Sequence, residues 1–407
     1  VILTWKALAD PTTGAFAVPG LEHIRDMQAV SDGEVVWTLD TYGGYLALGA
    51  ALTPLPAARL GAVAHAQWRG SAFFAHPELA SGPFAVGSAG PGVLSLVANP
   101  QYSLGGHPAY LDRALLRTYP SKGAMLRALQ TGEADVSFHL DPSDVGQLKG
   151  LPGSQASSAL GLRDEFLRPN PQAGPWAADT TLLAALAQAL DRQALVTLAV
   201  GDEGRASRGL FPSALAGWND PSLPAPASDP AAAVQRLEAD GWKAGADGVR
   251  VKGGRRLAFT VIAYCASPVV SATLSRLSDE WGKVGAAVTT ACRSHAELAQ
   301  ADAAGAFEMA LESNRWAPDP DAWTALAGRC ADPALAADFS AGASTVDSAR
   351  RHSAYRTAEK EWLAVQCTIP LFEWPDVAAV SSRLRNFFPD PSSLDVWNAA
   401  DWWLAAA

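Results

Sequence analysis

The sequence predicts an α/β protein organised in two lobes. The chain has 407 residues, and a domain typically holds roughly 100–200 residues, so two or three domains are expected. Apolar residues make up 49% and charged residues 18%, which is typical of a chain that folds around a core. Helical and strand-like patterns alternate, most clearly over 121–140 and 257–292, as in α/β folds.

The first part of the chain predicts helices and a small β-meander. A helix is expected over 1–8, and the turn that follows Val30 leads into a strand over 35–39. A second helix is expected over 56–66. Residues 81–119 read as three successive strands, and a serine-capped helix over 121–130 leads into another short strand.

The second part of the chain alternates helices with strands. The apolar spacing of 179–200 predicts one long helix, opened by an aspartate cap. The remaining elements expected, in order, are a capped helix over 229–240, hairpin turns at Asp247-Gly248 and Gly253-Gly254, a strand–helix–strand unit over 257–292, a helix over 345–364, a strand over 370–381 and a docked aromatic segment over 394–404.

The four cysteines carry no metal-ligand spacing. Cys265, Cys292, Cys330 and Cys367 form no CxxC pair and no Cys/His pattern, which argues against a zinc site. Cys265 and Cys292 each end a strand of the predicted strand–helix–strand unit, and a right-handed crossover brings both ends to one edge. Their Cα atoms are therefore expected about 4.4–6.8 Å apart, within bridging range. Two buried free thiols are the alternative, although an even count leans towards an oxidising compartment.

The charge balance excludes some partners. The net charge of −10 and the pI near 5.2 disfavour binding to nucleic acid or to an anionic membrane. No run of roughly 18 apolar residues is present to span a bilayer. The chain starts at Val1 inside a helical pattern, so we expect a preceding part that could carry a signal peptide or a lipid anchor.

Motifs for catalysis are missing from the sequence. There is no Walker loop, no GxGxxG after a strand and no GxSxG elbow, and the seven histidines are scattered without ligand spacing. Neither an enzyme nor a bound metal or other cofactor is expected. Asp319 and Asp321 could act as a hydrolytic acid and base, but one such pair among 41 acidic residues is weak support.

One loop is a candidate ligand contact. A strand-like run, FEMALES, delivers Asn314, Arg315, Trp316 and Asp319 onto a segment without helical periodicity. Loops at the ends of strands in α/β folds often bind ligands, and a tryptophan can supply apolar contact. A plain surface turn is the alternative interpretation of this segment.

Several ordered motifs resemble the extracellular solute-binding proteins of family 5, the oligopeptide, dipeptide and nickel receptors of ABC importers. The matching segments cover nearly the whole chain and are VILTWKALADP (1–11), SGPFAV (81–86), LVANPQYSLGGHPAYLDRALLRTYP (96–120), MLRALQTGEADV (125–136), ALAQALDRQALV (185–196), DPAAAVQRLEADGW (229–242) and IPLFEW (369–374). The chain departs from the family pattern at Thr180, Thr181 and Leu182, where arginines are usual, and in a short loop after Trp316.

The resemblance implies a type II periplasmic-binding-protein fold, with two lobes that close at a hinge over a ligand cleft. It assigns 1–168 to the first lobe with its extra subdomain, lacking its N-terminal strands, 169–366 to the second lobe, and 367–407 to a return into the first lobe. The implied protein is a monomer at the periplasmic or extracellular face of the membrane.

The implied function is capture of a short peptide or similar small solute for the membrane permease of an ABC importer. Two alternatives stay open. One is a chaperone-like interaction protein that has kept the fold, and the other is a binder of a non-peptide solute such as an oligosaccharide or a metal chelate.

The resemblance also suggests site residues. Peptide-binding members have a W-x-x-D element whose aspartate receives the ammonium group of the peptide, and Trp316 to Asp319 read W-A-P-D. Aligned differently, the P-D-P at 318–320 matches a family turn, which would make Asp319 structural. From the return segment, Phe388 and Trp397 are the expected first-lobe contacts, whereas Trp374 is expected in the core.

Overall fold

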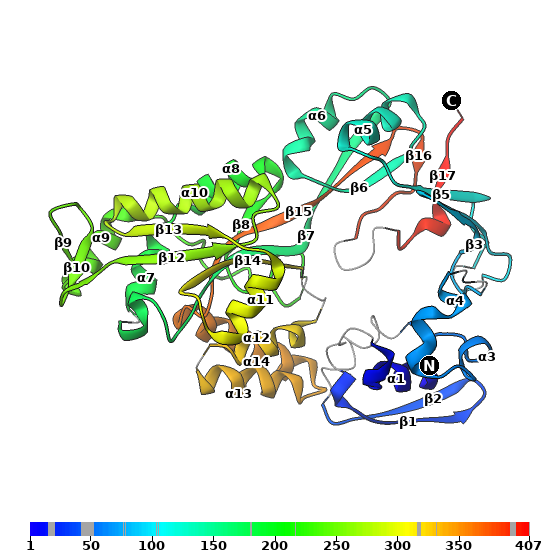
Figure 1. Ribbon diagram of the computed structural model, residues 1–407, viewed down its shortest axis with the longest axis horizontal. Helices are drawn as coiled ribbons and strands as arrows, with labels where there is room; N and C mark the ends of the chain where they lie inside the picture. The colour runs from blue at the N-terminus through cyan, green and yellow to red at the C-terminus, as the bar shows by residue number, and fades with distance from the viewer. Residues whose placement is uncertain are drawn as a thin grey trace. The chain divides into compact units, whose positions relative to one another are not determined.

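A computed structural model of the chain divides it into two compact units (Figure 1). It describes residues 1–14, 21–41, 53–75, 77, 79–102, 104, 106–179, 181–215, 217–315, 319–330, 332–390 and 396–406. Unit 1 comprises Val1–Ser158 and Val377–Ala407, and unit 2 comprises Ala159–Asp376. The lobe boundaries expected after residues 168 and 366 fall inside strand β7 (Ser154–Pro169) and shortly before strand β15 (Ile369–Ser381). The unit boundaries after Ser158 and Asp376 lie within these two strands, so no turn in the sequence marks the passage from one unit to the other.

Unit 2 is built on a mixed sheet. Its strands follow the order β13 (Ala287–Cys292), β12 (Ala258–Ala263), β14 (Met309–Arg315), β7 and β15, and the short β8 (Arg205–Ala206) pairs with β15. β12 runs parallel to both β13 and β14, whereas β14 and β7 are antiparallel. Three parallel strands therefore end at one edge of this sheet.

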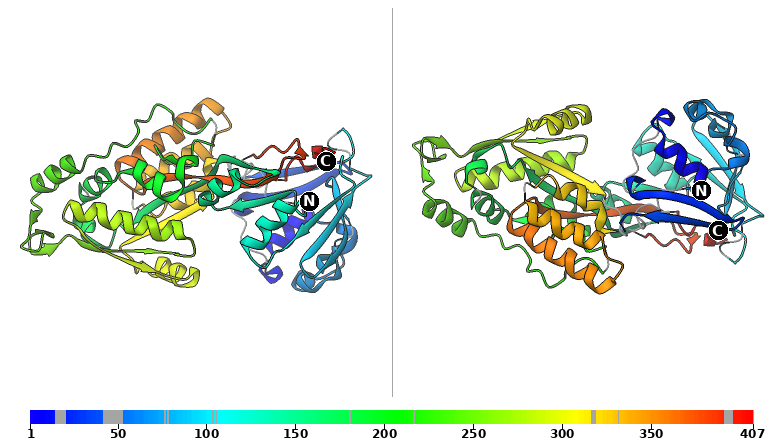
Figure 2. Two further views of the ribbon diagram at one scale, coloured as in Figure 1. Left: turned by 90° about the horizontal axis from the view of Figure 1, so that it is seen from above. Right: turned by 90° about the horizontal axis from the view of Figure 1, so that it is seen from below.

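Helices cover both faces of the unit 2 sheet (Figure 2). One face packs against α7 (Thr181–Gln188), α8 (Arg192–Ala199), α9 (Pro230–Ala239) and α10 (Pro268–Lys283). The other face packs against α11 (His295–Ala304), α12 (Thr324–Ala327), α13 (Pro333–Ala343) and α14 (Ser348–Ala364). Five tryptophans pack fully buried in these two cores: Trp176, Trp242, Trp281, Trp323 and Trp362.

The strand–helix–strand prediction over 257–292 is confirmed. Ser267 caps α10, whose buried Val270, Leu274, Leu277 and Trp281 recur at helical spacing. This crossover sets β12 beside β13 in parallel register, with Ala263 opposite Cys292. The predicted disulfide range is confirmed as well, because Cys265 and Cys292 are bridged with Cα atoms 5.5 Å apart.

A second disulfide joins Cys330 to Cys367, with Cα atoms 5.2 Å apart. Its cysteines lie at the two ends of the segment that contains α13 and α14. These two helices pack against each other and are drawn in orange in Figures 1 and 2. Folding of this helical pair brings the ends together, a proximity that no local sequence pattern indicates.

The prediction of one long helix over 179–200 is wrong. The segment forms α7 and α8, which are bent by 58° at a break. The cause is Asp191, whose carboxylate accepts a hydrogen bond from the backbone of Ala194 at 3.0 Å and so starts a new helix. Among the described residues, no individual helix has the length and apolar composition needed to cross a bilayer. The bent pair of α7 and α8 meets both criteria only when the two helices are counted together.

Unit 1 contains smaller sheets. α1 (Ile2–Ala9) packs on the hairpin of β1 (Ile24–Ser31) and β2 (Glu34–Leu39). The predicted meander is confirmed as the antiparallel strands β3 (Phe84–Gly90), β4 (Val93–Ala98) and β5 (Arg113–Arg117). The helix expected over 56–66 is shorter than predicted, since α3 (Ala57–Leu60) ends at Gly61, a residue of low helix propensity.

The rest of unit 1 completes the predicted elements. Ser121 caps α5 (Lys122–Thr131), which leads into β6 (Val136–Leu140) as expected. β16 (Leu384–Arg385) pairs with β17 (Trp403–Leu404), and this pairing docks the C-terminal segment. The short elements not yet described are α4 (Ala72–Ala75) and α6 (Val145–Lys149) in unit 1 and β9 (Lys243–Ala244), β10 (Arg250–Lys252) and β11 (Arg255–Arg256) in unit 2.

Candidate ligand-binding site

The carboxyl ends of β12, β13 and β14 form the candidate site in unit 2. In α/β sheets, ligands bind at this end of parallel strands because the loops there are free to vary. β14 ends at Arg315, and β12 is followed directly by Tyr264. Tyr264 is 41% exposed, and its ring stacks on His295 with centroids 3.7 Å apart. The Cys265–Cys292 bridge fixes β12 to β13 at this same edge.

An ion pair stands at the end of β14. The guanidinium of Arg315 donates to both carboxylate oxygens of Asp376, and the Nη1–Oδ2 distance is 3.1 Å. The side chains are 43% and 18% exposed, respectively. Partly exposed pairs of this kind contribute only about 0–1 kcal/mol to stability. Loss of this ion pair, with each side chain pairing instead with a charge on a ligand, would therefore cost the fold little.

Gly161 makes room for this pair. It lies in β7, and a Cβ atom built at this position would collide with the Asp376 carboxylate. Gly161 is itself buried. The absence of a side chain at this position lets the Asp376 carboxylate of β15 lie close to the backbone of β7.

A second cation lies next to the first along the sheet. Arg163 of β7 is opposite Arg315 of β14 in the antiparallel register. Its guanidinium lies 3.9 Å from the ring centroid of Trp374 and donates to Oγ of Ser313 at 3.0 and 3.2 Å. Stacking on the indole and hydrogen bonding to Ser313 together hold the orientation of this guanidinium.

A buried glutamate holds Trp374, the ring on which Arg163 stacks. Glu165 is 1% exposed, and its Oε2 accepts a hydrogen bond from the indole nitrogen of Trp374 at 3.0 Å. Burial raises the pKa of Glu165 to about 8, so the carboxyl group is mostly neutral at pH 7. Trp374 itself is 3% exposed and belongs to the hydrophobic core, as predicted.

Asp319 is engaged within unit 2. Its two carboxylate oxygens accept hydrogen bonds from Arg351 at 2.8 and 2.7 Å, and both residues are buried. One oxygen also accepts from the backbone of Asp321 at 3.0 Å, which caps the 3₁₀ turn Pro320–Trp323. An incoming ammonium group would have to compete with a buried arginine. This geometry favours the turn interpretation of Asp319 over the ammonium-acceptor interpretation.

The other predicted residues are spread over the chain. Asn314 lies opposite Asp164 in the β14–β7 register and so points to the face away from Arg315. Trp316 lies outside the described residues. Phe388 and Trp397 belong to unit 1, where they are 59% and 53% exposed and are joined by a 2.8 Å hydrogen bond from the Trp397 indole to the Phe388 carbonyl.

The structure thus joins Arg315 to a residue that sequence analysis missed. Asp376 lies in β15, a strand whose other residues are all buried. The signal available in the sequence was the presence of Asp376, an acidic residue, within the largely apolar run IPLFEWPDVAAV. Arg163 and Glu165 were missed because β7 was not predicted. Among the described residues, no group of three or more His, Cys, Asp or Glu side chains is arranged to hold a metal ion.

Comparison with known proteins agrees with the resemblance found in the sequence. Residues 1–333 match the family model of bacterial extracellular solute-binding proteins, family 5. The chain is 29% identical over 262 residues to Protein XP55 of Streptomyces lividans, an alignment that covers 64% of this chain and 46% of that relative. The chain therefore spans about half the length of this curated relative.

Solved structures show the same fold. The oligopeptide-binding protein AppA of Bacillus subtilis, in complex with a nonapeptide, is 20% identical with a TM-score of 0.75, and the match covers 99% of this chain and 82% of AppA. NikZ of Campylobacter jejuni, in complex with Ni(L-His), is 17% identical with a TM-score of 0.78, and the match covers 98% of this chain and 83% of NikZ. The chain belongs to the bacterial extracellular solute-binding proteins of family 5 and has the type II periplasmic-binding-protein fold.

Proposed function

We propose that this protein is the solute-binding component of an ABC importer and that it captures a short peptide or a similar small zwitterionic solute. The ion pair of Arg315 and Asp376 carries this proposal. It stands at the carboxyl edge of the parallel strands, is partly exposed, and presents one positive and one negative group side by side. A peptide carries one carboxylate and one ammonium group, and these complement the two charges.

Each group of the site has a distinct part in this proposal. Arg315 pairs with the ligand carboxylate, because a guanidinium matches the two oxygens of a carboxylate in a fork. Asp376 receives the ammonium group, whose burial without a carboxylate partner would be costly. Tyr264 offers a ring that contacts side chains without reading their identity, which suits variable peptides.

Most of the remaining predicted residues keep a place in the proposal. Trp316, Phe388 and Trp397 supply further aromatic contact, whereas Asn314, on the opposite face of β14 from Arg315, is given no ligand contact. Asp319 has a structural part, since its bond to Arg351 holds the 3₁₀ turn Pro320–Trp323.

The family and the disulfides support a proposal for the cellular setting. Both disulfides are typical of proteins exported to an oxidising compartment. We therefore place the protein in the periplasm or at the extracellular face of the membrane, as a monomer that delivers its solute to a membrane permease.

Native mass spectrometry of the purified protein tests the proposal, followed by calorimetry with a library of short peptides. We expect one peptide per chain and saturable binding. A bound oligosaccharide or metal chelate in place of a peptide would contradict the ligand class. Failure to bind any small solute, together with suppression of aggregation of unfolded proteins, would favour a chaperone-like function instead.

A further inference from the structure

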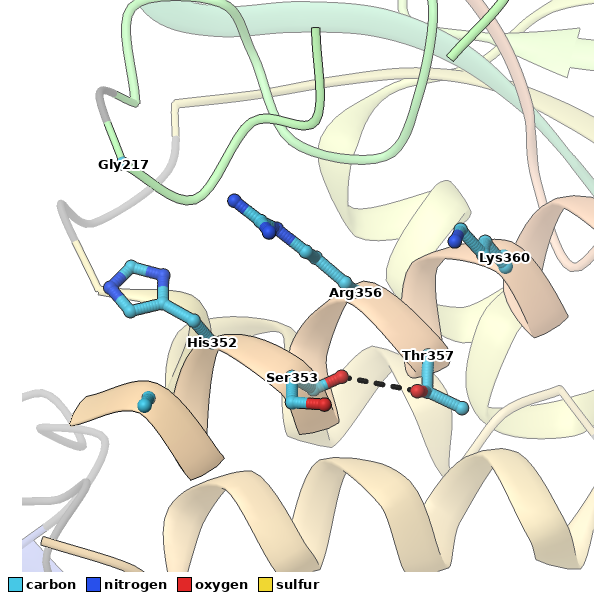
Figure 3. Close-up of a pocket in the computed structure, with 7 residues that line it drawn as sticks. Gly217, His352, Ser353, Arg356, Thr357 and Lys360 are labelled. Carbon is cyan, nitrogen blue, oxygen red and sulfur yellow. Dashed lines mark hydrogen bonds between the residues drawn. The ribbon is translucent and has the colours of Figure 1, made fainter. Parts of the chain in front are cut away.

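A cationic groove lies on α14, within unit 2, and the proposed peptide site does not use it (Figure 3). The groove has a volume of about 510 Å³. Its residues come from one face of the helix and from the loop at Gly217: Gly217, Ala349, His352, Ser353, Arg356, Thr357 and Lys360. Figure 3 shows Arg356 reaching from the helix towards the loop that carries Gly217.

The basic residues of the groove lie on one side of the helix. His352, Arg356 and Lys360 follow one another at intervals of four residues, which places them on the same side of an α-helix. Arg356 and Lys360 are exposed, and within the described part of the chain neither forms an ion pair. Two cations are thus held in a hollow on a chain whose net charge is −10.

Two carboxylates near the groove leave an excess of positive charge. Asp220 has a pKa lowered by hydrogen bonds from Ser222 and further by Arg356 and Lys360, so it stays ionised. Glu359 is 1% exposed and accepts from the backbone of Leu210 and Phe211, and burial raises its pKa to about 7. At neutral pH, therefore, only about one full negative charge and a partial one face the two cations.

The walls of the groove are held in place by packing. The ring of His352 stacks on Trp218 with centroids 4.1 Å apart and an interplanar angle of 22°. Trp218 in turn contacts Tyr355 edge-on at 5.5 Å and lies 4.9 Å from the guanidinium carbon of the buried Arg351. Gly217 has a φ of 89°, a conformation that favours glycine, and so the loop can turn over the helix at this point.

We propose that this groove binds a phosphate group, either as free phosphate or as part of a small phosphorylated solute. A phosphate has several oxygens that accept hydrogen bonds from different directions. A guanidinium, an ammonium group, an imidazole and the Ser353 hydroxyl along one helix face are donors that suit it. The site is independent of the proposed peptide site, because it uses none of the same residues.

Calorimetry with inorganic phosphate at low ionic strength tests the proposal. The wild-type protein is compared with the double variant Arg356→Gln/Lys360→Gln and with the control Arg350→Gln, which removes an exposed arginine of the same helix that does not line the groove. We expect saturable binding at one site, weakened about tenfold or more in the double variant and unchanged in the control. Circular dichroism of each variant checks that the fold is intact.

Three outcomes would overturn the proposal. They are no saturable phosphate binding by the wild-type protein, equal affinity in the double variant, and tighter binding of citrate than of phosphate in the groove. None of these results bears on peptide binding, which is measured separately with the same variants and is expected to be unchanged in all of them.

Discussion

Arg351 of α14 donates to both carboxylate oxygens of Asp319, the residue that caps the 3₁₀ turn Pro320–Trp323. The two residues are 32 positions apart, and each is less than 5% exposed. The pair therefore ties the start of a helix to the turn that precedes α12. Arg351 also lies 3.0 Å from Asp321, which extends the ion pair to a small buried network.

We expect Asp319→Asn to lower the free energy of unfolding by about 3–5 kcal/mol, because the substitution leaves the buried arginine without its charged partner. Chemical denaturation measures the change, with the exposed Asp202→Asn as control. Peptide affinity of the folded variant should be unchanged in calorimetry at matched pH and salt. Normal stability combined with a large loss of affinity would restore the ammonium-acceptor interpretation.

Arg315→Gln should weaken peptide binding about tenfold or more, because the variant cannot pair with the ligand carboxylate as an ion. Its stability should change by less than about 1 kcal/mol, since the Arg315–Asp376 pair is partly exposed. Calorimetry and denaturation separate the two effects, and Arg350→Gln serves as the matched control. Equal peptide affinity in both variants would place the ligand elsewhere.

The Cys265–Cys292 bridge should stabilise unit 2 by constraining the unfolded chain. The cysteines are 27 residues apart, and closing a loop of that length contributes about 3.5 kcal/mol. We expect Cys265→Ser/Cys292→Ser to lose about that much free energy of unfolding in denaturant. Peptide mapping without reduction should recover both cross-linked pairs; detection of free thiols at these four positions would contradict the assignment.

Glu165 should make stability depend on pH. Its pKa is about 8 in the folded state because of burial, against an ordinary value of 4.5. Between these pH values the unfolded chain releases a proton that the folded chain retains, so the free energy of unfolding falls as the pH rises. The total fall from this group is on the order of a few kcal/mol.

Glu165→Gln should reduce that pH dependence, because an amide keeps an oxygen for the Trp374 indole but does not ionise. Denaturation at several pH values between 5 and 8 measures the slope, and the exposed Glu34→Gln is the control. Some slope should remain from Glu359, whose pKa is raised to about 7 by burial. A slope identical to that of the wild-type protein would show that Glu165 ionises normally.

The sequence by itself determined the local elements and one long-range consequence of them. Apolar spacing and a serine cap predicted α10, strand patterns predicted β12 and β13, and the handedness of the crossover then placed Cys265 beside Cys292. These features depend on local periodicity and on a general rule of chain geometry. Both can be applied without knowledge of the rest of the fold.

Tertiary structure alone decided the rest, because the partners involved are far apart in the chain. β7 was missed since it does not alternate: its buried Glu165 and Arg168 find their partners in Trp374 and in Glu312 and Asp302. Asp376 reaches Arg315 across 61 residues, and Asp319 meets Arg351 only when α14 packs beside its turn. A charged residue in a strand is compatible with solvent or with a distant partner, and only packing, which sets the cost of burying the charge, distinguishes the two.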